Sequence, residues 1–283
     1  MTIYELLKYG EQLAEKNEKE ETAIKRLLMH VLEMEGYEII LNFEQQVSHE
    51  QMEAFKEGVH AYVYDNVPVQ YIIGHEYFYG YPFIVNEHVL IPRYETEELV
   101  SHVLRIYDEH FSGGEVDVVD VGTGSGAIAI TLALEESNMR VDATDISEDA
   151  LAVAKENAKN LNAKVNFIQG DMLEPLLKMG KRYDILVSNP PYIPDEEAVD
   201  PLVKDNEPHV ALFGGEDGMD FYEVILKDAK KVLKPKGVIL FEHGWNQRKR
   251  MMELIQKYFP HSEFQIIKDM NQKDRITFIK VEQ

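Results

Sequence analysis

Apolar residues in the first 65 positions recur with the spacing of one face of an α-helix. The clearest run lies at Ile24, Leu27, Leu28, Val31 and Leu32. The same spacing returns over residues 52–62. Thr2 and Ser48 each stand three residues before a Glu or Gln, which is the capping-box pattern of a helix start. We therefore predict a small helical bundle over residues 1–66.

The pattern changes over residues 67–92, where aromatic and β-branched residues replace the helical spacing. Gly74, Gly80, Pro82 and Asn86 interrupt this stretch. Because such residues separate short strands, the stretch predicts a β-hairpin that links the bundle to the rest of the chain.

Over residues 93–283, short apolar runs alternate with helical periodicity. The predicted strands cover residues 116–121, 140–144, 165–169, 183–188, 238–241, 263–268 and 275–281. Helices between most of these strands favour an α/β fold with a mostly parallel seven-stranded sheet. The last two strands follow each other without a helix, which predicts one antiparallel edge strand.

Composition and charge narrow the possible functions. The 283 residues include no cysteine, which excludes disulfide frameworks, thiolate metal sites and cysteine nucleophiles. The ten histidines form no metal-binding motif, so we predict no metal site. With 51 acidic and 29 basic residues, the net charge of −22 disfavours polyanionic partners such as bulk DNA. No signal peptide or spanning segment is evident, so we expect a cytoplasmic protein with no membrane partner.

A glycine-rich turn lies between a predicted strand and a predicted helix. Its candidate binding residues are Asp120, Gly122, Thr123, Gly124, Ser125 and Gly126. Alternate glycines let the backbone approach a ligand, and a helix N-terminus attracts a carboxylate or phosphate. Because Ala127 follows, the turn also fits the permissive pattern of dinucleotide-binding proteins. The turn therefore predicts a cofactor site without deciding which cofactor.

Acidic residues follow the next two predicted strands. Asp145 comes about 20 residues after the glycines, where a carboxylate can accept hydrogen bonds from both ribose hydroxyls of a nucleoside. Asp171, followed by Met172, lies where it can contact the adenine edge. Ligands bind at the carboxyl ends of strands in open α/β sheets, so we predict that these residues bind a nucleoside cofactor.

The fourth predicted strand of this region ends in the motif NPPY. It comprises Asn189, Pro190, Pro191 and Tyr192. The two prolines fix φ and lack N–H groups, so the loop is rigid and its carbonyl oxygens stay available as acceptors. The asparagine adds a side-chain acceptor, and the tyrosine adds a flat face for stacking. Two rigid acceptors can hold both hydrogens of a planar NH₂ group while its nitrogen stays open to an electrophile.

Together, the glycine-rich turn, Asp145 and NPPY resemble class I S-adenosylmethionine-dependent methyltransferases that methylate planar amino nitrogens. NPPY is shared by N6-adenine DNA methyltransferases and protein glutamine methyltransferases. Further motifs resemble the release factor glutamine methyltransferase (HemK/PrmC) family over nearly the whole chain. They are PVQYI at 68–72, VLIPR at 89–93 with Thr96 and Glu97 after it, Glu207 with Pro208, ALFGG at 211–215 and EHG at 242–244. Tyr94 with Glu95, and residues 269–275, depart from the usual family pattern.

This resemblance implies a Rossmann-like methyltransferase domain at residues 93–283, a substrate-recognition bundle at 1–66 and a hairpin linker at 67–92. The cofactor would be S-adenosylmethionine, with S-adenosylhomocysteine as product, and Asn189 would join the turn and the acids in binding it. The substrate would be the glutamine of the Gly-Gly-Gln motif of peptide chain release factors, methylated at N5. Asn189, Pro190 and Tyr192 would be catalytic, with the Asn189 oxygen and the Pro190 carbonyl as acceptors and Tyr192 stacking on the amide. Pro191 would complete the substrate site, in a monomer.

Three alternatives stay open on the sequence. A nucleic-acid N6-adenine methyltransferase would share the chemistry, but the net charge of −22 argues against direct contact with nucleic acid. A nicotinamide dehydrogenase would explain the glycines but not NPPY, and a protein that only binds would not need the intact motif. The long acidic connection at residues 193–215 predicts a mobile substrate lid. An acidic enzyme would also attract release factors, which must present basic surfaces to RNA.

Overall fold

The chain forms two compact units in the computed structural model, which describes residues 1–281. The first unit comprises Met1–His75 together with Val199–Asn206. The second comprises Glu76–Ala198 and the chain from Glu207 onward. The first unit therefore extends past residue 66 and also takes in a distant segment of the chain.

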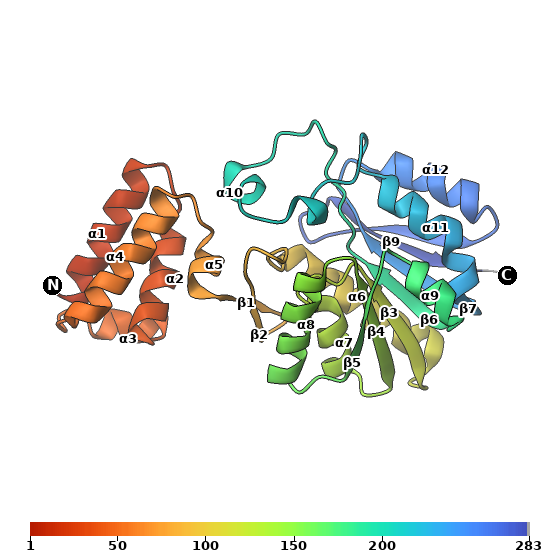
Figure 1. Ribbon diagram of the computed structural model, residues 1–283, viewed down its shortest axis with the longest axis horizontal. Coiled ribbons are helices and arrows are strands. Elements are labelled where there is room, and N and C mark those ends of the chain that lie inside the picture. Colours follow the sequence, from red (N-terminus) through yellow and green to blue (C-terminus); the bar gives the residue numbers. More distant parts are fainter. Residues whose placement is uncertain (282–283) are drawn as a thin grey trace. The chain divides into compact units, whose positions relative to one another are not determined.

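The first unit is a helical bundle, as the periodicity predicts. Its helices are α1 (Ile3–Lys16), α2 (Glu21–Leu32), α3 (Gly36–Leu41), α4 (His49–Val63), α5 (Val69–Ile73) and α10 (Pro201–Lys204). Helices α1, α2 and α4 pack against one another (Figure 1). Both capping boxes are confirmed, since the Thr2 and Ser48 side chains accept from the backbone three residues on. Ile24, Leu28 and Phe55 are fully buried in the shared core.

Two segments beyond residue 66 join this bundle because their apolar side chains reach its core. Val69 on α5 is buried in that core, and Leu202 on α10 packs against it. Asn206 Nδ2 also donates to the Asn66 carbonyl at 2.8 Å. The middle of the connection predicted as a lid is thus packed in the first unit. Its ends are paired in the second unit, where the Gly214 amide donates to the Ile193 carbonyl at 2.9 Å.

A hairpin lies within the predicted stretch, as β1 (His75–Phe78) and β2 (Tyr81–Ile84), but it is shorter than predicted because Val69–Ile73 forms the helix α5. Tyr79 and Gly80 at its turn both have positive φ, at 53° and 82°, as expected for the turn that matches the twist of a tight hairpin. Phe78 and Phe83 are fully buried and pack edge to face. The hairpin therefore does more than link two parts, because it contributes to the core of the second unit.

The second unit is built on a seven-stranded sheet with the order β5-β4-β3-β6-β7-β9-β8. Its strands are β3 (Val116–Val121), β4 (Met139–Asp145), β5 (Val165–Gln169), β6 (Tyr183–Ser188), β7 (Leu233–Glu242), β8 (Glu263–Lys268) and β9 (Asp274–Lys280). Strands β3 to β7 pair in parallel, and β9 is antiparallel to both β7 and β8. The mostly parallel sheet with antiparallel pairing at one edge is confirmed. The antiparallel strand itself lies one place inside the edge strand β8.

Helices cover both faces of this sheet (Figure 1). Side chains of α6 (Tyr94–Phe111), α7 (Ala127–Glu135) and α8 (Glu148–Asn160) join one core, which also contains Val118 and Ile185. Side chains of α9 (Glu174–Met179), α11 (Asp220–Val232) and α12 (Arg248–Tyr258) join the other, with Val119 and Leu186. Successive strand residues alternate between the two cores, as the pleat of a strand requires.

The strand order also explains why the two central motifs meet. From β3 the chain first moves outward to β4 and β5, and it then returns to the opposite side of β3 as β6. Such a reversal opens a crevice at the carboxyl ends of the two adjacent strands. The glycine-rich turn follows β3 and the NPPY motif follows β6, so both lie at this crevice.

Candidate active site

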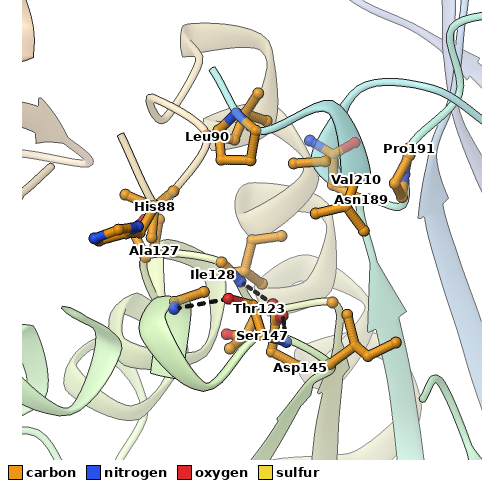
Figure 2. Close-up of a pocket in the computed structure, with 18 of the residues that line it drawn as sticks. His88, Leu90, Thr123, Ala127, Ile128, Asp145, Ser147, Asn189, Pro191 and Val210 are labelled. Atoms are coloured by element: carbon orange, nitrogen blue, oxygen red, sulfur yellow. Dashed lines mark hydrogen bonds between the residues drawn. The ribbon is translucent and has the colours of Figure 1, made fainter. Parts of the chain in front are cut away.

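A cavity of about 270 Å³ lies at the carboxyl ends of β3, β4 and β6. The predicted site residues that line it are Gly122, Thr123, Gly124, Ser125, Asp145, Asp171, Met172, Asn189 and Pro191. Figure 2 shows Asp145 and Ser147 toward one end, and Asn189, Pro191 and Val210 toward the other. The fold thus brings the glycine-rich turn, the two acids and the NPPY motif around one space.

The glycine-rich turn depends on backbone conformations that side chains disfavour. Gly122, Gly124 and Gly126 have φ values of 75°, 55° and 84°. At Gly126 a Cβ would lie 2.7 Å from Ile130 Cδ1 in the first turn of α7, so the Ile130 side chain would have to shift. At Gly122 and Gly124 an added Cβ would meet nothing within 4 Å. The turn therefore leaves open space beside its backbone, into which a ligand fits.

The Asp145 side chain is hydrogen-bonded to the backbone of this turn and of its own loop. Its Oδ2 accepts from the Gly124 amide at 2.8 Å, and its Oδ1 accepts from the Ser147 amide at 2.9 Å. Burial raises the pKa of the carboxyl group, although both amide hydrogen bonds oppose that shift. The carboxylate therefore orders the turn and at the same time presents acceptor oxygens to the cavity.

The segment after β5 brings Asp171 and Met172 to the cavity wall. Asp171 is exposed there. Met172 has a φ of 43°, in the left-handed region that residues with side chains rarely adopt. The Thr144 hydroxyl donates to its carbonyl at 3.3 Å. A strained residue of this kind on a cavity wall is typical of binding sites.

Asp120 lies behind the glycine-rich turn and does not line the cavity. Its Oδ2 accepts from Thr123 Oγ1 at 2.6 Å, and its Oδ1 has no partner among residues 1–281. Full burial raises the pKa of the carboxyl group to about 7. Asp120 supports the turn from within through Thr123, and neither Asp120 nor Gly126 is among the residues that line the cavity.

The raised pKa of Asp120 predicts a dependence of stability on pH. The folded protein keeps a proton on Asp120 up to about pH 7, whereas the unfolded chain releases it near pH 4. The free energy of unfolding therefore falls as pH rises through this window, by at most about 1.4 kcal/mol per pH unit for this group. We expect Asp120→Asn to flatten the slope, measured by urea denaturation between pH 4 and pH 8. An unchanged slope in that variant would contradict the assignment.

In the NPPY motif, one end of the Asn189 side-chain amide is hydrogen-bonded within the protein, and the other end is not. Nδ2 donates to Thr96 Oγ1 at 3.1 Å, while Oδ1 accepts no hydrogen bond from the described residues. Pro191 lines the cavity, but the buried Pro190 does not. Tyr192 packs against the core that includes α11 and does not line the cavity, and burial holds its pKa above the usual range. Its phenol stays protonated and serves the packing of the loop.

Two neighbouring loops hold the backbone of this motif. Gln247 Nε2 donates to the Tyr192 carbonyl at 2.8 Å, and Gln247 Oε1 accepts from the Gly244 amide at 2.8 Å. At Gly214 and Gly218, an added Cβ would overlap the carbonyl oxygens of Pro191 and Tyr192, respectively. Gly214 and Gly218 are therefore required because their backbone packs directly on the NPPY backbone.

Several residues of the site lack any role in the sequence-based prediction. Thr96 and Glu242 form a buried pair behind Asn189, with Thr96 Oγ1 donating to Glu242 Oε2 at 2.7 Å. Glu207 accepts from the Ile91 amide at 3.0 Å and pairs with Arg93, which lines the cavity. Each of these residues, Ile91 included, stands in a motif that carries the family resemblance or beside one. The motifs therefore pointed to these residues, although they did not show which of them pair with one another.

Asn157 also supports the site, and no motif marks it. From within helix α8, its Nδ2 donates to the Ser125 carbonyl at 3.0 Å, and its Oδ1 accepts from the Ile84 amide at 2.7 Å. It thereby joins the glycine-rich turn to the hairpin. A single asparagine inside a helical pattern gives no indication of such a role.

The described chain offers neither a metal cluster nor a spanning helix. Within residues 1–281, no three His, Asp or Glu side chains are arranged so that they could bind a metal ion. In the same residues, no helix combines the length and apolar character needed to span a bilayer.

Comparison with known proteins gives two matching family models. The model of a methyltransferase domain matches residues 113–278, and the model of the PrmC N-terminal domain matches residues 5–74. A release factor glutamine methyltransferase of Bacillus cereus is 44% identical over 284 residues, which cover 100% of both chains. Another, of Bacillus subtilis, is 47% identical over 277 residues, or 97% of this chain and 96% of that protein.

Solved structures share the fold at low sequence identity. The hMettl16 catalytic domain aligns with a TM-score of 0.55 and 14% identity, covering 82% of each chain. A methyltransferase from Pyrococcus furiosus aligns with a TM-score of 0.51 and 18% identity, covering 73% of this chain and 91% of that one. These structures confirm the class I methyltransferase fold.

Proposed function

The chain belongs to the release factor glutamine methyltransferase family, and on this basis we propose a specific reaction for it. The enzyme transfers the methyl group of S-adenosylmethionine to the side-chain amide nitrogen, N5, of the glutamine in the Gly-Gly-Gln motif of peptide chain release factors. One observation carries this proposal. Asn189 lines the cavity, and its Nδ2 is hydrogen-bonded to Thr96, so its Oδ1 remains available as an acceptor.

The residues around the cavity fit S-adenosylmethionine. The open space beside Gly122 and Gly124 accommodates a ligand close to the backbone. Asp145 offers carboxylate oxygens for the ribose hydroxyls, and Asp171 and Met172 offer contacts to the adenine. Asn189 stands toward the other end of the cavity (Figure 2). The proposal places the reacting groups beside it. When bound, the cofactor supplies a sulfonium whose methyl group is strongly electrophilic.

The protein acts mainly by positioning, because an amide nitrogen is a poor nucleophile. Asn189 Oδ1 accepts one N–H of the substrate amide. The backbone carbonyl of Pro190, which stands between the cavity-lining residues Asn189 and Pro191 and has no donor among the described residues, accepts the other when the substrate is bound. These bonds strengthen as the nitrogen bonds the methyl carbon and its hydrogens become more acidic. One proton then leaves to water. Pro191 forms part of the wall, and Tyr192 holds the loop in place.

We infer a monomeric, cytoplasmic enzyme that acts on a protein partner. The net charge of −22 attracts a basic protein at long range and repels nucleic acid. S-adenosylmethionine carrying a labelled methyl group, incubated with purified release factor or with adenine-containing duplex DNA, tests this partner. We expect label in the protein and none in the DNA. Label in the DNA alone would favour an N6-adenine methyltransferase instead.

The ribose role of Asp145 predicts a loss of cofactor affinity. Removing a charged acceptor of a hydrogen bond costs about 1.5–3 kcal/mol, so Asp145→Ala should weaken S-adenosylmethionine binding about 10–100-fold. The single-turnover rate at saturating cofactor should change much less. Isothermal titration calorimetry measures the affinity, and an unaltered dissociation constant would remove Asp145 from the ribose site.

A further inference from the structure

Asn189 is held by a chain of two hydrogen bonds that ends in a buried carboxylate. Asn189 Nδ2 donates to Thr96 Oγ1 at 3.1 Å, and Thr96 Oγ1 donates to Glu242 Oε2 at 2.7 Å. Thr96 is 5% exposed and Glu242 is 1% exposed. The three residues stand after β6, in the first turn of α6 and at the end of β7. Only the folded second unit brings them together.

The direction of this chain follows from the number of hydrogens available. A hydroxyl group has one hydrogen, and an ionised carboxylate can only accept. With its hydrogen directed to Glu242, Thr96 can only accept from Asn189. The Asn189 amide must therefore present its NH₂ end to Thr96, and its Oδ1 end points the other way.

We propose that Thr96 and Glu242 are positioning residues that fix the orientation of the Asn189 amide for methyl transfer. The inference rests on the proposed function, because that function assigns Asn189 Oδ1 as the acceptor for the substrate amide. Without these two hydrogen bonds, the Asn189 amide can turn by 180° and direct its own hydrogens toward those of the substrate. That orientation replaces an attractive contact with a repulsive one.

The surroundings of Glu242 make the chain sensitive to pH. Burial raises the pKa of Glu242 to about 7, and Glu95 on α6 adds to the shift, while Thr96, Asn189 and the Arg275 guanidinium on β9 oppose it. The hydroxyls of Tyr192 and Tyr222 face the same region, and Tyr222 donates to the Glu242 backbone carbonyl at 2.7 Å. A protonated Glu242 can donate to Thr96. The Thr96 hydrogen is then free to bind Asn189 Oδ1, which reverses the chain.

The first test compares Thr96→Val with Thr96→Ser in single-turnover methyl transfer to release factor at pH 8. Valine keeps the shape and removes the hydroxyl, so we expect about a tenfold lower rate. Serine keeps the hydroxyl and should stay within about threefold of the wild type. The KM for release factor and the affinity for S-adenosylmethionine should be nearly unchanged in both variants. A Thr96→Val enzyme with the wild-type rate, or a serine variant as slow as valine, would overturn the proposal.

The pH profile provides a readout that a merely structural role would not move. Neither the substrate amide nor the sulfonium titrates near neutrality, and Asp120, whose pKa is also about 7, supports the cofactor turn and not Asn189. At saturating cofactor we therefore expect the wild-type rate to rise with an apparent pKa near 7, in Asp120→Asn as well. In Glu242→Gln that rise should disappear, and its persistence would contradict the role of Glu242.

A measurement without activity separates this inference from the proposed function. The side-chain NH₂ signal of Asn189, identified by its loss in Asn189→Ala, should exchange with solvent more slowly in the wild type than in Thr96→Val. Equal exchange rates would contradict the hydrogen-bond chain even if the enzyme methylates release factors. Slow exchange in a protein that methylates no glutamine would instead contradict the proposed function, while the hydrogen-bond chain would still stand.

Discussion

Asn189→Ala is expected to lower the single-turnover rate of methyl transfer by about 10²–10³, which is the cost of removing one preorganised polar partner of a reacting group. The open Oδ1 of Asn189 is the side-chain acceptor that the NPPY motif offers to the substrate amide, and alanine removes it. The Pro190 carbonyl remains in the variant, so activity should fall without vanishing.

The measurement is rapid-quench transfer of labelled methyl at saturating cofactor and release factor. Asn160→Ala, at an exposed position at the end of α8, is a matched control that should keep the wild-type rate. Calorimetry should show that cofactor affinity changes much less than the rate in Asn189→Ala. An unchanged rate in that variant would remove Asn189 from the chemistry.

Gly218→Ala should produce the second largest loss, about 10²-fold in rate, although residue 218 does not line the cavity. An added Cβ would overlap the Tyr192 carbonyl oxygen and lie 2.5 Å from Gln247 Nε2. The hydrogen bond between those two groups would have to break, and the NPPY backbone would have to move. A displacement of about 1 Å at a reacting centre is enough for a loss of this size.

Gly180→Ala provides the matched control for backbone strain. Gly180 has a φ of 66°, close to the 74° of Gly218, but an added Cβ there meets nothing within 4 Å. Both variants should lose some stability, which thermal unfolding measures. Only Gly218→Ala should lose activity at a temperature where both are folded. Equal activities in the two variants would show that the 211–218 segment does not hold the NPPY backbone.

Periodicity and turn residues suffice to predict the seven strands of the sheet and the longer helices, although α5 lies in a stretch predicted as a hairpin. The strands predicted at 116–121 and 183–188 match β3 and β6 in the structure. The association of Val199–Asn206 with the helical bundle could not be predicted. It depends on Leu202 and Asn206 contacting residues far away in the sequence.

In the candidate site, too, local sequence predicts some features and tertiary packing decides the others. The glycine-rich turn, Asp145 and Asn189 follow directly from motifs at strand ends. Which side chains reach the cavity is decided by packing, and Asp120 and Tyr192 are not among the residues that line it. The Thr96–Glu242 hydrogen bond joins residues 146 positions apart, and no local pattern predicts such a pair.

The most direct test of the proposed function is methylation of a purified release factor, either wild type or with the glutamine of its Gly-Gly-Gln motif replaced by alanine. The enzyme and labelled S-adenosylmethionine are the same in both reactions, and incorporated label is counted. We predict stoichiometric labelling of the wild-type factor and none of the variant. Equal labelling of the two factors would contradict the proposed substrate.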